Sequence, residues 1–148
     1  MRALLQRVSR AAVRVDGAAV AEIGEGLLVL LGVGPEDDEA VGRGLAQKVV
    51  ELRIFRDEAG KTNRSLLDVG GEVLAVSQFT LFGDTRKGRR PSFLDAAPPE
   101  LGRALYEAFA IAVEARGVRV GRGMFGTEMS VELVNDGPMT IWLDSDAR

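Results

Sequence analysis

Apolar and polar residues alternate near the start of the chain, in short runs separated by turn residues. The alternating runs are residues 3–8, 13–15 and 19–23, and the turn signals are Asp16-Gly17 and residues 24–26. A period of two is typical of strands with one buried face, and the close turns favour antiparallel pairing. The run LLVLLGV at residues 27–33 is apolar throughout and predicts a buried strand.

Two later segments carry apolar residues at helical spacing. In residues 38–52 these are Val41, Leu45, Val49 and Leu52. Acidic residues in the first turn agree with a helix there. A second helix is predicted to begin at Pro98-Pro99 and to end at Gly117. Its buried face is formed by Leu101, Leu105, Phe109 and Val113.

The rest of the chain predicts further strands and one long loop. The strands are residues 54–55, 72–82, 118–120, 130–134 and 139–143, the last two joined at residues 135–138. Residues 83–97 have no period and carry several charges, so we expect an exposed loop. The pattern predicts one mixed α/β domain over residues 1–148, with two amphipathic helices packed on mainly antiparallel, barrel-like β-sheets.

Composition excludes several classes of enzyme. A chain of 148 residues is long enough for one domain with its own core. It has no cysteine and no histidine, which removes Ser-His-Asp and Cys-His triads, thiolate zinc sites and histidine proton transfer. We expect neither a metal nor a cofactor. The net charge of −3 indicates neither a DNA nor a membrane partner.

The chain carries no predicted targeting or membrane segment. Its first ten residues contain three arginines and lack the apolar core of a secretory signal. Residues 27–33 are far shorter than the roughly 18 apolar residues that a membrane-spanning helix needs. We therefore expect a cytoplasmic protein.

Two segments combine polar or charged groups in places where chemistry is possible. Ser77, Gln78, Phe79 and Thr80 lie late in a predicted apolar strand, so their polar groups either cap the sheet edge or face a cleft. Residues 86–90 hold Arg86, Lys87, Arg89 and Arg90, a compact basic cluster in an acidic chain. Such a cluster is either a solvated loop or a local phosphate contact.

Two further segments are rich in glycine. Residues 121–126 contain three glycines, which either form a bend between strands or let a ligand approach the backbone beside Phe125. The spacing does not match a dinucleotide-binding fingerprint. Residues 135–138 (NDGP) favour a hairpin turn. The alternative is a cis Gly-Pro bond whose neighbouring carbonyls are held rigidly enough to accept hydrogen bonds from an ammonium group.

Together these segments resemble the D-aminoacyl-tRNA deacylase family over essentially the whole chain. The resemblance rests on SQFTL at 77–81, GDTRKGRRPSF at 83–93, MFG at 124–126 with Met129, and NDGPMT at 135–140. The segments MRALLQRVSRAAVRVDG at 1–17 and NRSLLD at 63–68 also resemble that family.

The resemblance implies a cytoplasmic homodimer that hydrolyses the ester between a D-amino acid, or mischarged glycine, and the terminal adenosine of tRNA. Its catalytic site would contain Ser77, Gln78, Phe79 and Thr80, and its adenosine pocket Phe125, Gly126 and Met129. A cis Gly137-Pro138 segment, with Met139 beside it, would enter the pocket of the partner subunit, with Arg7 bracing that segment. The basic cluster at 86–90 would contact the acceptor end of the tRNA.

The residue types are consistent with catalysis by main-chain groups. An aminoacyl ester is already activated, so a placed water and donors aimed at the oxyanion, such as backbone N–H groups near Phe79 and Thr80, are the main requirements. Thr80 as a nucleophile would need a base, and the chain has no histidine. We therefore favour positioning by Thr80 and assistance from the 2′-hydroxyl of the tRNA. Two alternatives stay open: a Ser/Thr esterase with Lys87 as base, and a non-catalytic module that binds the tRNA acceptor end.

Overall fold

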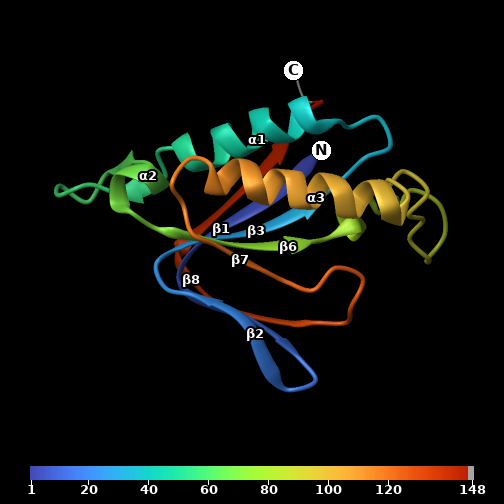
Figure 1. The fold of residues 1–148 in the computed structure, drawn as a ribbon, viewed down its shortest axis with the longest axis horizontal. Coiled ribbons are helices and arrows are strands. Elements are labelled where there is room, and N and C mark those ends of the chain that lie inside the picture. Colours follow the sequence, from blue (N-terminus) through green and yellow to red (C-terminus); the bar gives the residue numbers. More distant parts are fainter. Residues whose placement is uncertain (147–148) are drawn as a thin grey trace.

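A computed structural model describes residues 1–146 and shows a strongly curved six-stranded sheet with helices on one face (Figure 1). The strand order is β2-β1-β3-β6-β7, and β8 pairs with the other edge of β1. The strands of this sheet are β1 (Arg2–Val15), β2 (Ala18–Ile23), β3 (Gly26–Gly32), β6 (Glu72–Ser77), β7 (Val120–Arg122) and β8 (Ser130–Asp144). The mixed α/β, barrel-like fold expected from the sequence is confirmed.

Pairing direction follows from the connections between the strands. β1 is antiparallel to β2, β3 and β8, as the close turns predict. β3 and β6 are parallel, as are β6 and β7. Parallel neighbours need a crossover, and helices α1 (Glu39–Glu51) and α3 (Pro99–Glu114) provide the two crossovers. The sheet therefore combines antiparallel and parallel pairs, whereas the sequence predicts mainly antiparallel pairing.

Both predicted helices are present, and they lie side by side on the same face of the sheet (Figure 1). The carboxylate of Asp38 caps α1 by accepting a hydrogen bond from the backbone N–H of Val41. Pro99 occupies the first turn of α3, where its missing N–H removes no helical hydrogen bond. The buried residues of α3 include Leu105, Phe109 and Val113 from the predicted stripe.

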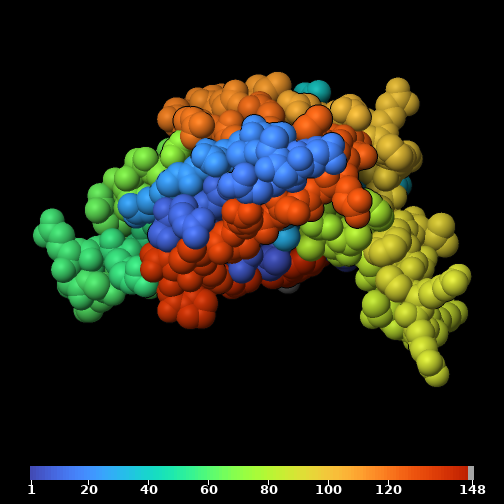
Figure 2. Space-filling model, turned by 90° about the horizontal axis from the view of Figure 1, so that it is seen from below, coloured from blue at the N-terminus to red at the C-terminus, as the bar shows by residue number. Residues whose placement is uncertain are grey.

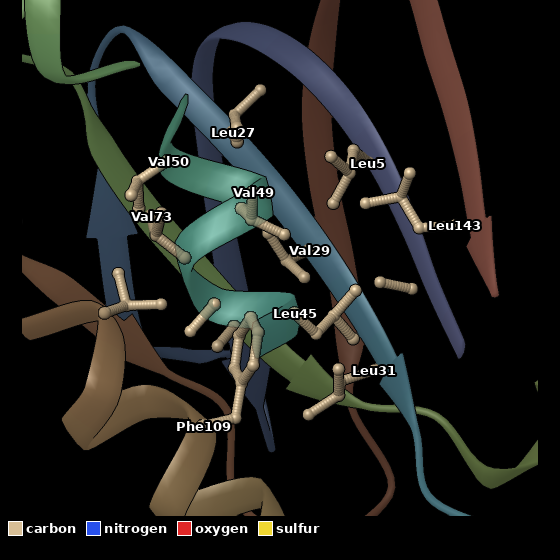
Figure 3. Close-up of a cluster of buried hydrophobic side chains, with 14 of the residues drawn as sticks. Leu5, Leu27, Val29, Leu31, Leu45, Val49, Val50, Val73, Phe109 and Leu143 are labelled. Atoms are coloured by element: carbon tan, nitrogen blue, oxygen red, sulfur yellow. The ribbon is translucent and has the colours of Figure 1, made fainter. Parts of the chain in front are cut away.

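The sheet is buried on both faces in its centre, which explains why LLVLLGV has no polar position. Leu27, Val29 and Leu31 point toward the helices, where they pack with residues such as Val49 and Phe109 (Figure 3). Leu28 belongs to a second cluster inside the curl of the sheet, with Val8, Val13, Ile23, Leu74 and Val76. Alternate residues of one strand thus enter two different cores.

Several boundaries differ from the sequence prediction. Residues 3–8 and 13–15 belong to one continuous strand, β1, because β8 pairs with it along most of its length. Residues 72–82 are not one strand: β6 ends at Ser77, and Phe79–Phe82 forms a 3-10 helix, η1. Two short strands, β4 (Phe55–Arg56) and β5 (Thr62–Arg64), precede a one-turn helix, α2 (Leu66–Val69).

The hairpin predicted at residues 135–138 is wrong. Ser130–Asp144 is one strand, and both of its halves pair antiparallel with β1. The register shifts around Val8, so residues 136–139 form an outward loop within the strand instead of a chain reversal. The turn signal is real, but the pairing of both halves with β1 determines the path of the chain.

Within residues 1–146, no helix is long and apolar enough to cross a membrane. The same residues contain no group of three or more acidic side chains arranged to hold a metal ion.

Candidate active site

A cavity of about 570 Å³ opens at the carboxyl end of β6. Its walls come from β6 and η1, from the segment before α3, from the start of α3, and from the connection between β7 and β8. The residues lining it are Val33, Val76, Ser77, Gln78, Phe79, Phe93, Ala96, Ala97, Pro99, Gly102, Phe125, Gly126, Thr127, Met129 and Val131. The volume lies in the range of small-molecule binding sites.

The SQFT segment forms one wall of this cavity because the strand ends there. The backbone N–H of Gln78 still donates to the carbonyl of Leu31 at 2.8 Å, and the chain then turns into η1. The side-chain amide of Gln78 donates a hydrogen bond to the hydroxyl of Thr80. Because that hydroxyl accepts from Gln78, its own proton is left to donate elsewhere.

The first turn of η1 presents backbone donors. Phe79 and Thr80 begin this helix, so their N–H groups have no acceptor within it. No other acceptor for these two groups is found within residues 1–146. Both residues are exposed. Donors of this kind can stabilise a developing negative charge.

Three aromatic side chains form part of the cavity lining. Phe79 is 56% exposed and meets Phe93 edge to face, with ring centroids 5.2 Å apart. Phe125 is partly buried and packs against Tyr106, whose centroid lies 6.3 Å away. The buried hydroxyl of Tyr106 donates to the carbonyl of Ala75 on β6, which ties α3 to the sheet beside the cavity.

Burial raises the pKa of Tyr106 to about 12, so this hydroxyl stays protonated and keeps its donor role across the physiological pH range.

The basic cluster lies on a loop that projects from the body of the molecule, yellow in Figure 2. Backbone hydrogen bonds between Asp84 and Ser92 close the base of this loop. Arg86 donates two hydrogen bonds to the carboxylate of Asp84, at 2.9 and 2.7 Å. These bonds, together with the backbone N–H of Arg86, lower the pKa of Asp84 to about 2. Arg86 therefore stabilises the loop, whereas Lys87, Arg89 and Arg90 form no ion pair within residues 1–146.

The loop at 135–139 is held from several sides. The Gly137–Pro138 peptide bond is cis, and Gly137 and Pro138 are exposed. The side-chain oxygen of Asn135 accepts from the backbone N–H of Met139 at 3.0 Å, and its amide donates to the hydroxyl of Thr140. The first and last residues of the NDGPMT segment therefore meet across the loop.

Arg7 supports this loop from beneath. Its side chain is almost fully buried and donates to the backbone carbonyls of Asp136, at 3.0 Å, and Ile54, at 2.6 Å. A Cβ atom at Gly137 would lie 2.9 Å from the guanidinium of Arg7, and Gly137 has φ of +138°. Position 137 therefore requires glycine, both because of its backbone conformation and because Arg7 lies so close.

Asp136 joins the same network through its carboxylate. Arg56 donates to it at 2.9 Å, and Arg7 lies 3.5 Å from it. The hydrogen bond from Arg56 is the main reason why the pKa of Asp136 lies below its usual value.

Within one chain, the Gly137-Pro138 loop lies away from the cavity. Ser77 on β6 pairs with Leu31 on β3, and Leu31 pairs with Ala3 on β1. Gly137 lies on β8, at the opposite edge of β1, near Arg7. Three strand spacings of about 4.8 Å and roughly 13 Å along the strand therefore separate the two sites. The structure thus brings Ser77, Gln78 and Phe79 together with Phe125, Gly126 and Met129, but not with Gly137, Pro138 or Met139 of the same chain.

Sequence reasoning missed some residues of the site. Phe93 and Ala97 line the cavity from a segment predicted only as a loop. Gly102 lies on the buried side of α3, where a Cβ atom would be 3.6 Å from the Phe125 ring. A glycine within a predicted helix was a usable signal of close packing. Thr80 does not line the cavity itself; it contacts Gln78, which does.

Comparisons with known proteins identify relatives of this chain. A family model described as D-Tyr-tRNA(Tyr) deacylase matches residues 4–144. The D-aminoacyl-tRNA deacylase of Thermomicrobium roseum is 63% identical over 98% of this chain and 94% of its own length. The enzyme of the same name from Deinococcus radiodurans is 58% identical over 97% of this chain and 99% of its own length.

Solved structures share the fold. The structure of a protein named c-Myc DNA Unwinding Element Binding Protein is 40% identical, with a TM-score of 0.93, and covers 99% of this chain and 100% of its own. A second structure, described as a probable eukaryotic D-amino acid tRNA deacylase, has a TM-score of 0.86 at 22% identity, over 96% of this chain and 97% of its own. The family match, the identity to curated relatives and the fold agree over nearly the full length. The chain therefore belongs to the D-Tyr-tRNA(Tyr) deacylase family, a family of hydrolases.

Proposed function

We propose that this chain hydrolyses the ester bond of D-aminoacyl-tRNA. Water adds to the ester carbonyl, the bond to the ribose oxygen breaks, and that oxygen takes up a proton, which releases the D-amino acid and free tRNA. The observation that carries the proposal is the cavity that joins the SQFT backbone to the Phe125 wall. The names and high identity of the curated relatives support it.

The two ends of the cavity suit the two parts of this substrate. Phe125, Gly126 and Met129 provide an apolar surface for the terminal adenosine, and an aromatic ring can stack on a base. Ser77, Gln78 and Phe79 lie at the other end, where the ester would be placed. The free N–H groups of Phe79 and Thr80 are then the donors for the oxyanion.

Among the residues that the structure describes, no base is hydrogen-bonded to a hydroxyl of this site. Neither the Ser77 nor the Thr80 hydroxyl forms a hydrogen bond to a lysine or a carboxylate within residues 1–146, and Lys87 is on the exposed loop. This argues against a Ser/Thr esterase that uses Lys87. We infer that the main chain and the 2′-hydroxyl of the tRNA act on the water, while Gln78 and Thr80 position the ester.

Chiral selection follows if two chains form a homodimer. Gly137, Pro138 and Met139 of the partner subunit would then complete the cavity, their carbonyls holding the substrate ammonium and filling the space of an L side chain. The exposed, well-supported loop at 135–139 and its distance from its own cavity support this arrangement. Because the filter excludes a side chain, glycyl-tRNA passes it and is hydrolysed as well.

The basic loop supplies the contact with the tRNA backbone. Lys87, Arg89 and Arg90 are exposed and unpaired within residues 1–146, so they can approach phosphates near the acceptor end. Arg86 keeps the loop in shape through Asp84. We place the protein in the cytoplasm, where aminoacyl-tRNAs are used.

The test is a direct comparison of three substrates: D-tyrosyl-tRNA, L-tyrosyl-tRNA and a small chromogenic ester. We expect fast release of D-tyrosine, little release of L-tyrosine and little cleavage of the small ester. Equal rates on both tRNAs would reject the chiral filter. Cleavage of the small ester alone would indicate the esterase, and tRNA binding without any cleavage would indicate the non-catalytic binding module.

A further inference from the structure

One cation beside the cavity has no role in the function described above. Arg103 is on the exposed side of α3, next to the cavity-lining Gly102. Its guanidinium carbon lies 4.6 Å from the centroid of the Phe125 ring, which is the distance of a cation stacked on an aromatic face. Phe125 is part of the cavity wall, so Arg103 lies at the edge of the proposed adenosine pocket.

Arg103 also has no ionic partner among the residues that the structure describes. No carboxylate within residues 1–146 lies in ion-pair distance of its guanidinium, whereas Arg122 on β7 forms ion pairs with Glu107 and Glu114 of α3. A guanidinium stacked on a ring keeps its N–H donors in its own plane, so they point past the ring edge. These donors are therefore open to an anion at the mouth of the cavity.

The anion nearest to an adenosine in this pocket is the phosphate on its 5′ carbon. We propose that Arg103 binds this phosphate, which in tRNA links the terminal adenosine to the preceding nucleotide. The proposal rests on the proposed function for the identity of the nucleoside, but its ligand class, an adenine nucleotide phosphate, is testable by itself. Planar, two-pronged donors match phosphate oxygens well.

The rival role for Arg103 is a positioning one, in which it only holds the Phe125 ring. The two roles differ in what they predict for a nucleoside without phosphate. A phosphate contact affects only phosphorylated ligands, whereas loss of ring positioning weakens both ligands equally. Adenosine and AMP are therefore a matched pair of probes.

The experiment measures binding of adenosine and AMP by calorimetry at low salt to the full chain and to three variants. Arg103→Gln removes the charge, Arg103→Lys keeps it, and Arg43→Gln removes one arginine from α1, which takes no part in the cavity. We expect the unaltered protein to bind AMP roughly tenfold more tightly than adenosine. Arg103→Gln should abolish this preference, Arg103→Lys should retain part of it, and Arg43→Gln should leave it unchanged.

Each other outcome overturns the proposal. If the unaltered protein binds both probes equally, or neither, Arg103 does not bind the phosphate. If Arg103→Gln weakens both probes by the same factor, its role is to position Phe125. Thermal unfolding of each variant is the control for the fold, and we expect unchanged melting temperatures because both substituted positions are exposed.

A kinetic measurement separates this inference from the proposed function. D-tyrosyl-tRNA contains the phosphate, and D-tyrosyl-adenosine does not. We expect Arg103→Gln to raise KM severalfold for the tRNA only and to leave kcat unchanged. Absence of deacylation by the unaltered protein would reject the proposed function, while the AMP preference would still decide the role of Arg103.

Discussion

At the scale of single residues, the site differs from most hydrolase sites in having few groups that titrate near neutral pH. Thr80 accepts a hydrogen bond from Gln78, and the free backbone donors of Phe79 and Thr80 stand beside it. The sequence indicated this kind of site through the absence of histidine and cysteine. It could not indicate that the strand ends at Ser77, because the apolar pattern continues to Phe82.

A Thr80→Ala variant tests the positioning role of this hydroxyl. We expect roughly a three- to tenfold lower kcat on D-tyrosyl-tRNA, because a contact that orients the ester is lost while the backbone donors remain. Tyrosine release under single-turnover conditions measures this. Near-complete loss of activity with unchanged tRNA binding would instead make Thr80 a direct participant in the chemistry.

Arg7 is expected to contribute strongly to stability. In Arg7→Ala, the backbone carbonyls of Ile54 and Asp136 lose the donor that Arg7 provides. Because these groups are buried or partly buried, the free energy of unfolding should fall by about 3 kcal/mol. Arg14→Ala is a matched control on the same strand, because its pair with Glu132 is exposed and is worth less than about 1 kcal/mol. Urea unfolding compares the two. Equal losses would contradict a special role for Arg7.

At the scale of elements, two loops obtain their shape from contacts that local patterns do not encode fully. In the basic loop, Arg86 donates hydrogen bonds to Asp84, two residues before it. The sequence alone suggested four equivalent cations in this loop and did not show that one of them is used in this pair. Residues 135–138 have a strong turn signal, yet their neighbours pair with β1 on both sides. Register with a distant strand overrides the turn signal.

The pH dependence of the basic loop follows from the pKa of Asp84. Hydrogen bonds from Arg86 lower this pKa from the usual 3.8 to about 2, so the ionised form is favoured in the folded protein. The contribution of the pair to stability is present above about pH 4 and is lost as the pH falls toward 2. An NMR titration of the Asp84 carboxyl carbon should show a midpoint near 2, and Arg86→Gln should return it toward 3.8. A midpoint near 3.8 without the substitution would show that the pair does not form in solution.

In the proposed mechanism, chiral selection depends on the 135–139 loop. Gly137→Ala places a Cβ atom 2.9 Å from the Arg7 guanidinium at a φ of +138°, so the loop must shift. We expect the ratio of D- to L-tyrosyl-tRNA hydrolysis to fall by about tenfold or more, since roughly 1.4 kcal/mol of discrimination would be lost. Gly60→Ala, in a turn remote from the cavity and also at positive φ, is the control for a general effect of strain. An unchanged ratio in Gly137→Ala would remove the loop from the selection mechanism.

At the scale of the whole molecule, two large apolar side chains of β8 are exposed to solvent. Val134 is 41% exposed and Trp142 is 48% exposed. β8 also carries the Gly137-Pro138 loop. A homodimer that covers part of this strand would explain both features, because it buries apolar area and brings the loop of one subunit to the cavity of the other.

The single tryptophan of the chain makes dimer formation measurable. We expect Trp142 to become less exposed in the dimer, so its fluorescence emission should shift to longer wavelength as the protein is diluted below the dissociation constant. Sedimentation velocity over the same concentrations gives the oligomeric state independently. A monomer at all concentrations would exclude the cross-subunit filter.

The sequence by itself determines the kinds of elements and most of the chemical groups of the site. Period-two and helical spacings predict the strands and both long helices, because those patterns depend on neighbours within a few residues. Tertiary structure alone decides that β8 is one strand, that Arg7 lies under Gly137, and that Arg103 stacks on Phe125. These features join residues far apart in the chain, and their energies depend on packing and register that no local pattern contains.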